Sequence, residues 1–154
     1  MKVSIDGIND VYEYIRQGAK FESVIANLEN LQGAGLKNLD ISIGFTTQAY
    51  NVFQLPEFIE FFEKYVSVDR ISTHLLHDPE LLTINAIAEP YKSKIINKLE
   101  NSTFDFGAII KTLKNEGENS PLWEKLVKYS ANLDTRFKTK ISFESLMDRY
   151  LDGY

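Results

Sequence analysis

Three short strand patterns, each followed by a helical pattern, constrain the fold of this chain more than any other feature of its sequence. Residues 2–7 alternate apolar and polar side chains, residues 39–45 are rich in isoleucine, and residues 70–76 form the third strand pattern. Strands that alternate with helices in this way join as parallel β-α units with right-handed crossovers. The sequence therefore predicts an α/β fold in which residues 1–103 form three successive parallel β-α units.

Apolar side chains spaced three and four residues apart predict a helix after each strand. The first helix is expected over residues 10–31, with an interruption at Gly18. The second is expected to begin near Leu55, because Pro56 is tolerated in the first turn of a helix. The third is expected over residues 84–101, where five apolar side chains share one helical face.

Residues 104–154 show a different pattern, with helical stretches and no good candidate for a strand. The expected helices cover residues 106–114, 122–134 and 143–150, and residues 115–120 form a polar loop. We expect this helical tail to pack on the three β-α units. At 154 residues the chain is long enough for one domain with a proper core, so a single domain is predicted.

Composition excludes several classes of function. The net charge of −5 provides no basic footprint for nucleic acid, and no stretch approaches the roughly 20 apolar residues that span a membrane. The chain contains no cysteine, and so no disulfide, thiolate zinc site or iron–sulfur ligand of its own. We therefore expect a cytoplasmic protein that binds neither nucleic acid nor membranes.

Motifs for metal, hydrolase and phosphate-loop chemistry are weak or missing. His74 and His77 lie three residues apart, so in a strand their side chains point to opposite faces and cannot share a metal ion unless the strand has already turned by His77. No GxSxG elbow is present to support a hydrolase triad. The glycines of residues 33–35 follow a helix instead of a strand, which is the wrong context for a phosphate loop. We predict no metal site.

The end of the first strand carries the more informative residues. Ser4 lies at this strand end, and Arg16 lies on the helix that follows. A hydroxyl and a guanidinium placed there can hold a ribose and a carboxylate, respectively. The alternative is that Arg16 is an exposed charge on an amphipathic helix. Asp6 and Asp10 have a spacing that is common at any solvated helix start, where acidic groups favour the helix dipole.

Four segments resemble one family, the radical S-adenosylmethionine enzymes of the SPASM and twitch group. SIDG with VYEYIRQGAKFESVIANLENL is similar to the fourth strand and helix of these enzymes, and DISIGFTTQAYNVFQLPEFIEFFEKY to the fifth. RISTHLLHDPELLTINAIAEPYKSKIINKLE resembles the sixth strand and the helical segment after it. YSANLDTRFKTKISFESLMDRY is similar to the segment that closes twitch-type members. The likeness implies the carboxyl-terminal half of a partial TIM-like barrel.

The resemblance also implies particular residues. Ser4 corresponds to the ribose-binding strand residue, Arg16 to the arginine that meets the methionyl carboxylate, and Leu75 to the position beside the adenine. Gln48 and Asn51, in and after the polar loop expected at residues 46–48, would face the substrate. Without the resemblance, Leu75 is interpreted as a core residue and Asn51 as a helix cap. In this family three cysteines of a CxxxCxxC loop in the first half-barrel bind the [4Fe–4S] cluster.

Two classes of function are consistent with the resemblance. The chain is expected to be a fragment or truncated form of a radical enzyme that modifies a peptide or another substrate, inactive alone because the cluster half is absent. Met1 directly before a strand favours this interpretation. The alternative is a non-catalytic interaction module on the same scaffold; an unrelated α/β enzyme that uses strand-end carboxylates is a third possibility. The expected partner is a cluster-bearing half, or a second copy that pairs with the edge of the first strand.

Overall fold

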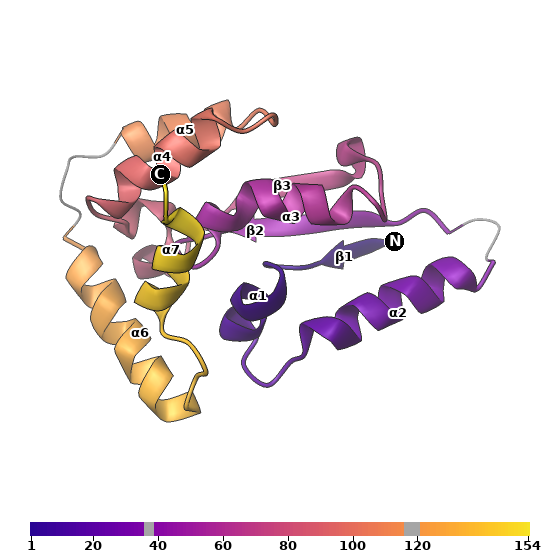
Figure 1. Ribbon diagram of the computed structural model, residues 1–154, viewed down its shortest axis with the longest axis horizontal. Coiled ribbons are helices and arrows are strands. Elements are labelled where there is room, and N and C mark those ends of the chain that lie inside the picture. Colours follow the sequence, from indigo (N-terminus) through magenta and orange to yellow (C-terminus); the bar gives the residue numbers. More distant parts are fainter. Residues whose placement is uncertain (36–38, 116–120) are drawn as a thin grey trace.

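A computed structural model describes residues 1–35, 39–115 and 121–154, and it contains one parallel sheet of three strands (Figure 1). The strands are β1 (Lys2–Ser4), β2 (Ser42–Thr47) and β3 (Ile71–Leu75), and they lie in the order β1-β2-β3. Ser4 is in register with Gly44, and Thr47 with Leu75. The predicted α/β fold with three parallel strands is confirmed, and the strands lie side by side in chain order.

The first predicted helix is wrong in one respect, because it is two helices. α1 (Asn9–Ile15) and α2 (Phe21–Gly33) are separated at Gly18, whose φ of +87° does not fit a helix. The other residues of this segment keep the expected periodicity, with Val11 and Leu28 buried. Glycine supplies this φ without a Cβ clash, so the interruption that the sequence indicated is a full break between two helices.

The second helix begins where predicted, at α3 (Leu55–Phe62), with Pro56 in its first turn and the 3₁₀ turn η1 (Val52–Gln54) before it. The third helix is wrong at its start, because α4 covers only Tyr91–Glu100. Pro90 disfavours helical geometry in the residue before it, and the chain upstream forms 3₁₀ turns instead. These turns are η3 (Glu80–Leu82) and η4 (Ile84–Ala86), and a further one, η2 (Val68–Arg70), precedes β3.

The second strand also differs from its predicted bounds. β2 begins at Ser42, not at residue 39, and it includes Thr46 and Thr47, which were expected in a loop. Thr46 pairs with His74 and Thr47 with Leu75, so pairing with β3 extends the strand through two residues whose polar character suggested a loop. β-branched threonine suits a strand when a partner is present.

The helical tail is confirmed by α5 (Gly107–Lys114), α6 (Trp123–Phe137) and α7 (Phe143–Leu151). The described part of residues 104–154 contains no strand. The Ser142 side chain accepts the backbone N–H of Ser145 and caps α7. Of the loop predicted at residues 115–120, residues 116–120 lie outside the described residues.

The core lies between one face of the sheet and the helices. Ile43 and Phe45 of β2 are fully buried on this face. The Phe45 ring packs edge-on against the Phe58 ring of α3, with 4.4 Å between the ring centroids. The same hydrophobic cluster continues into the tail through Leu126 and Leu146. The largest fully buried side chains are Phe45, Phe53, Phe58, Phe62, Phe143, Ile5, Ile43, Leu55, Ile87, Ile95, Leu99 and Leu113.

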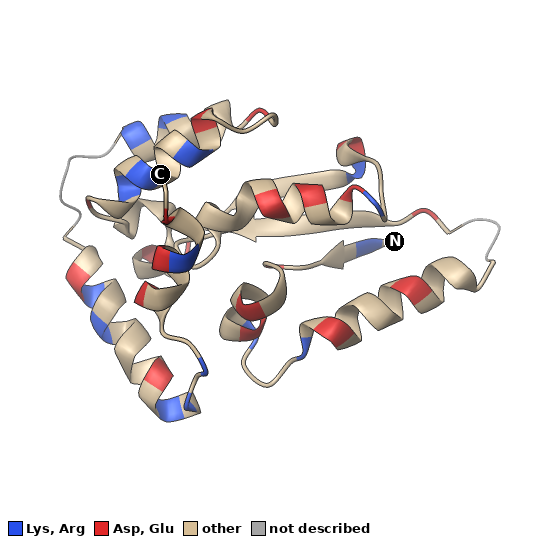
Figure 2. Cartoon of the chain, viewed as in Figure 1, with Lys and Arg blue, Asp and Glu red and all other residues tan. Residues whose placement is uncertain are grey.

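Charged contacts tie the carboxyl-terminal helices to the first part of the chain. Residues 1–90 hold 6 basic and 13 acidic side chains, whereas residues 91–154 hold 11 basic and 9 acidic ones. Figure 2 shows the acidic residues along α2 and α3 and many of the basic ones on α4, α5 and α6. Lys98 of α4 pairs with Glu57 of α3, and Arg149 of α7 pairs with Asp10 of α1. Opposite charge thus favours docking of the carboxyl-terminal helices on the helices beside the sheet.

None of the helices in the described residues combines the length and the apolar character needed to cross a lipid bilayer.

Candidate functional site at the carboxyl ends of the strands

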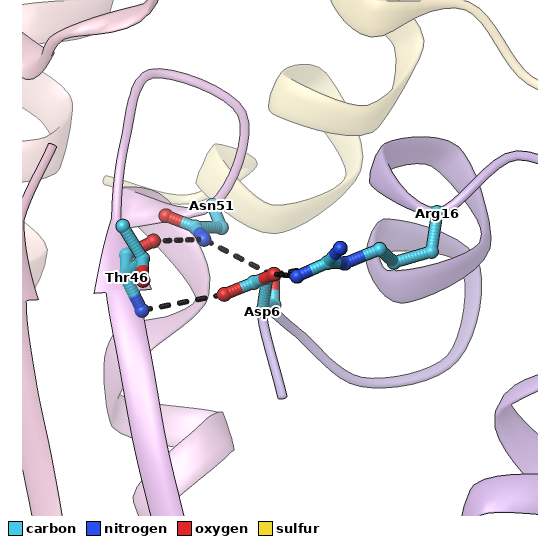
Figure 3. Close-up of polar contacts among 4 residues, drawn as sticks. All are labelled: Asp6, Arg16, Thr46 and Asn51. Atoms are coloured by element: carbon cyan, nitrogen blue, oxygen red, sulfur yellow. Dashed lines mark hydrogen bonds and ion pairs between the residues drawn. The ribbon is translucent and has the colours of Figure 1, made fainter. Parts of the chain in front are cut away.

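The carboxyl ends of the parallel strands point toward α4–α7, while the N-terminus lies at the far end of the sheet (Figure 1). Ligands of open parallel sheets bind beyond the carboxyl ends of the strands. A compact polar cluster occupies this edge between β1 and β2, and it consists of Asp6, Arg16, Thr46 and Asn51 (Figure 3). We define these four residues as the strand-end cluster.

Asp6 is the centre of the strand-end cluster. Its residue is only 3% exposed, yet its carboxylate has a partner for each oxygen. Oδ2 accepts the Nε and Nη2 donors of Arg16 at 3.0 and 2.5 Å, and Oδ1 accepts the backbone N–H of Thr46 at 3.4 Å. A carboxylate this well buried needs such partners, because burial of an unpaired charge costs several kcal/mol.

Asn51 joins the ends of the two strands. Its side-chain Nδ2 donates to the backbone oxygens of Asp6 at 3.1 Å and of Thr46 at 2.9 Å. Its Oδ1 accepts the backbone N–H of Gln48 at 2.8 Å. Because Asn51 is fully buried, these bonds satisfy main-chain groups that water does not reach. The Asn51 side chain therefore fixes the relative positions of β1 and β2 at their carboxyl ends.

Gly7 gives the turn after β1 its shape. Its φ is +150°, and a Cβ at this position would lie 2.8 Å from Cγ1 of Val11. The side chain of Gln54 then bonds to the main chain of Ile8 from both of its amide atoms, at 2.8 and 3.2 Å. The SIDG segment therefore turns sharply and places α1 so that Arg16 reaches back to Asp6.

The face of the sheet opposite the core is polar. We define it as the open face, made of side chains that share one side of the three strands by their register: Lys2, Ser4, Ser42, Gly44, Thr46, Ser72 and His74. Lys2, Ser4 and His74 are exposed, and the Lys2 Nζ lies 3.1 Å from the His74 Nε2. The aliphatic stem of Lys2 lies over Gly44, where an added Cβ would come within 2.6 Å of Cε.

The structure brings some of the predicted site residues together and separates others. Ser4 is exposed on the open face, two residues before Asp6, and Arg16 reaches the same strand end through Asp6. Gln48 and Asn51 lie at this edge as well, but both are buried. The side chain of Leu75 is in register with Thr47 and so lies on the core side of the sheet, opposite Ser4.

A cleft of about 380 Å³ lies at the carboxyl end of β3. Its apolar wall includes Leu75, Leu76 and Ile84, and His77 and Glu80 line its polar side. The Oδ1 atom of Asn85, which also lines this cleft, is buried without a hydrogen-bond partner among the described residues. The cleft thus combines an apolar wall with a few polar groups.

The described residues contain no group of three or more His, Asp or Glu side chains that could hold a metal ion. His74 instead lies beside Lys2, while His77 lines the cleft at the end of β3.

Sequence reasoning missed Asp6 and Thr46 as members of the cluster. The sequence suggests a solvated acid at a helix start for Asp6, and a loop position for Thr46. One signal was present in the sequence. An acidic residue at the end of a strand and an arginine ten residues later can come into contact when the chain turns between them. Sequence alone does not report that Asp6 is buried, and burial is what makes its pairing with Arg16 obligatory.

In comparisons with known proteins, no protein-family model matches this chain, and neither the curated proteins nor the solved structures contain a significant match.

Proposed function

We propose that this chain is one half of a radical S-adenosylmethionine barrel, and that its open face and strand-end cluster form part of the binding site for S-adenosylmethionine. The observation that carries the proposal is the open face. Parallel sheets are almost always covered on both faces. Here helices bury one face, whereas Ser4 and His74 on the other face are exposed.

A barrel interior accounts for a parallel sheet of this kind. When a sheet closes into a barrel, its helices all lie outside and its inner face meets the inner faces of the other strands. Small side chains such as Ser4 and Ser72 on that face leave room for a ligand, whereas the stem of Lys2 lies over Gly44. A face made of large apolar side chains would instead support a filled core.

The residues fit the chemical groups of S-adenosylmethionine. The Ser4 hydroxyl would bind the ribose, and Arg16 retains donors for the carboxylate. The cleft at the carboxyl end of β3, which Leu75 lines from the core side of the sheet, would receive the adenine ring beyond the strand end. Leu75 would contact the adenine through its backbone or through the part of its side chain that lines the cleft. When bound next to a [4Fe–4S] cluster, this cofactor supplies a radical for abstraction of hydrogen from a substrate.

The cluster itself must come from another half, because this chain has no cysteine to bind it. We propose that this cluster-bearing half, or a second copy of the chain, pairs with the outer edge of β1. β1 is an edge strand of the sheet, and an unpaired edge offers its backbone groups to another strand. The parent activity would be radical modification of a peptide or another substrate.

The proposal is tested by titrating the ¹⁵N-labelled chain with S-adenosylmethionine and following its amide resonances. We expect shifts at Ser4, Gly44, Ser72 and Arg16 that saturate near a Kd of about 1 mM, which corresponds to roughly −4 kcal/mol for half of a site. Ser4→Val should abolish these shifts, because it removes the hydroxyl from the open face.

Thr73→Val is the matched control, because Thr73 is an exposed strand residue on the core side of the same sheet. It should leave the titration unchanged. If the wild-type spectrum does not respond to millimolar S-adenosylmethionine, the proposed cofactor site is refuted, and the interaction module becomes the better interpretation of the scaffold.

A further inference from the structure

Asp6 and Arg16 form an unequal pair. The side chain of Asp6 is 5% exposed, whereas that of Arg16 is 52% exposed, so the pair is anchored at one end and open to solvent at the other. Asp6 engages the Nε and Nη2 atoms of Arg16, which form the side edge of the guanidinium (Figure 3). The Nη1 atom has no partner among the described residues.

A guanidinium carries five N–H donors, and two of them suffice for the contact with Asp6. The two hydrogens on Nη1 and the second hydrogen on Nη2 remain. One hydrogen of Nη1 and this hydrogen of Nη2 point in the same direction and form the end edge of the planar group. This end edge matches the two oxygens of another carboxylate. The geometry therefore allows Arg16 to bind Asp6 and a ligand carboxylate at the same time.

We infer that Asp6 is a positioning residue, which holds Arg16 so that the end edge of its guanidinium receives the carboxylate of an α-amino acid group on the ligand. This inference rests on the proposed function, whose cofactor carries such a group. An unrestrained arginine would lose rotamer entropy on binding, and Asp6 removes part of that loss beforehand.

The anchor is itself rigid. The second oxygen of Asp6 accepts the backbone N–H of Thr46, and the Asp6 backbone oxygen accepts a bond from Asn51. The orientation of Arg16 is thus set by β1 and β2 together, not by α1 alone. A loss of the Asp6 charge would free the guanidinium without removing it.

The test compares S-adenosylmethionine with 5′-methylthioadenosine, which keeps the nucleoside and lacks the amino acid group. The wild-type chain should bind S-adenosylmethionine more tightly, by about tenfold, the ratio expected from one charged hydrogen-bonded contact. Asp6→Asn should reduce that ratio toward one and leave the affinity for 5′-methylthioadenosine unchanged. Arg16→Lys keeps the charge but loses the planar pair of donors, so it should also reduce the ratio toward one. Because Arg16 is half-exposed, this variant should fold, and it tests the inference even if Asp6→Asn does not fold.

Asp10→Asn is the matched control, because Asp10 also pairs with an arginine, Arg149, but on the exposed surface. Its ratio should equal that of the wild type. An unchanged ratio in both Asp6→Asn and Arg16→Lys overturns the inference. If wild type binds 5′-methylthioadenosine but with no preference for S-adenosylmethionine, the nucleoside site of the proposed function stands and the inference fails.

A second measurement separates the inference from the proposed function when neither compound binds. The Arg16 Nε–H resonance should exchange slowly with water in the wild type and become fast in Asp6→Asn, while Asp10→Asn leaves it slow. Slow exchange that Asp6→Asn abolishes shows that Asp6 orients Arg16 even if the ligand is another amino acid derivative. Fast exchange in the wild type overturns the positioning role.

Discussion

Replacement of Gly7 by alanine should destabilise the chain far more than the same replacement at Gly18. Both glycines have a positive φ, +150° at Gly7 and +87° at Gly18, so both substitutions carry backbone strain of about 1–3 kcal/mol. Their surroundings differ. A Cβ on Gly7 would lie 2.8 Å from Cγ1 of the buried Val11, whereas a Cβ on Gly18 has no atom within 4 Å.

The contact at Gly7 adds a second cost. Val11 is fully buried, and the backbone N–H of Tyr12 lies 3.1 Å from the added carbon, so relief requires a shift of α1. Overpacking of this kind costs about 1–3 kcal/mol. We therefore expect Gly7→Ala to lower the free energy of unfolding by about 2–6 kcal/mol, and Gly18→Ala by about 1–3 kcal/mol.

Urea unfolding at 25 °C, followed by tryptophan fluorescence and by circular dichroism, measures both variants against the wild type. Gly18→Ala is the control, since it isolates the strain from the contact. Equal losses of stability in the two variants would refute the packing of α1 against the turn after β1, and with it the geometry that brings Arg16 to Asp6.

Three further predictions concern the rest of the chain. Lys98→Met should lower the free energy of unfolding by about 2–4 kcal/mol, because Lys98 is 3% exposed and the half-buried Glu57 loses its partner. The double variant with Glu57→Gln should recover part of this loss, as measured by urea unfolding. Burial raises the pKa of Tyr50 to about 12, above the value near 10 expected in the unfolded chain. The free energy of unfolding should therefore fall as the pH rises from 10 to 12, and Tyr50→Phe should reduce that fall when unfolding is measured as a function of pH. Light scattering at high protein concentration should detect a dimer through the β1 edge, and a monomer under those conditions would contradict the pairing.

The elements that could be predicted from sequence are those whose local pattern agrees with their final environment. α3 begins at Leu55 with Pro56 in its first turn, as the sequence indicated, because proline constrains the chain within one or two residues. The tail helices could be predicted from apolar periodicity in the same way. The bounds of β2 could not, because Thr46 and Thr47 look like loop residues until β3 is placed beside them.

The start of α4 shows another limit of local reasoning. Ile84 and Ile87 fit the apolar spacing of a helix, and both are buried as a helical face would require. They lie instead in and after a 3₁₀ turn, and the helix begins only after Pro90. Apolar spacing reports which side chains are buried, and several backbone conformations can bury the same ones.

The sequence by itself determined the class of the fold, the alternation of strands and helices, the helical tail and the absence of cysteine ligands for a cluster. Each of these depends on periodicity or on residue identity, which operate over a few neighbouring positions. Only the tertiary structure decided that Asp6 is buried, that it holds Arg16, that Asn51 joins the ends of β1 and β2, and that one face of the sheet is polar and open. These features depend on contacts between segments about 10 to 45 residues apart, and burial, which sets the energy of each polar contact, exists only once those segments have packed.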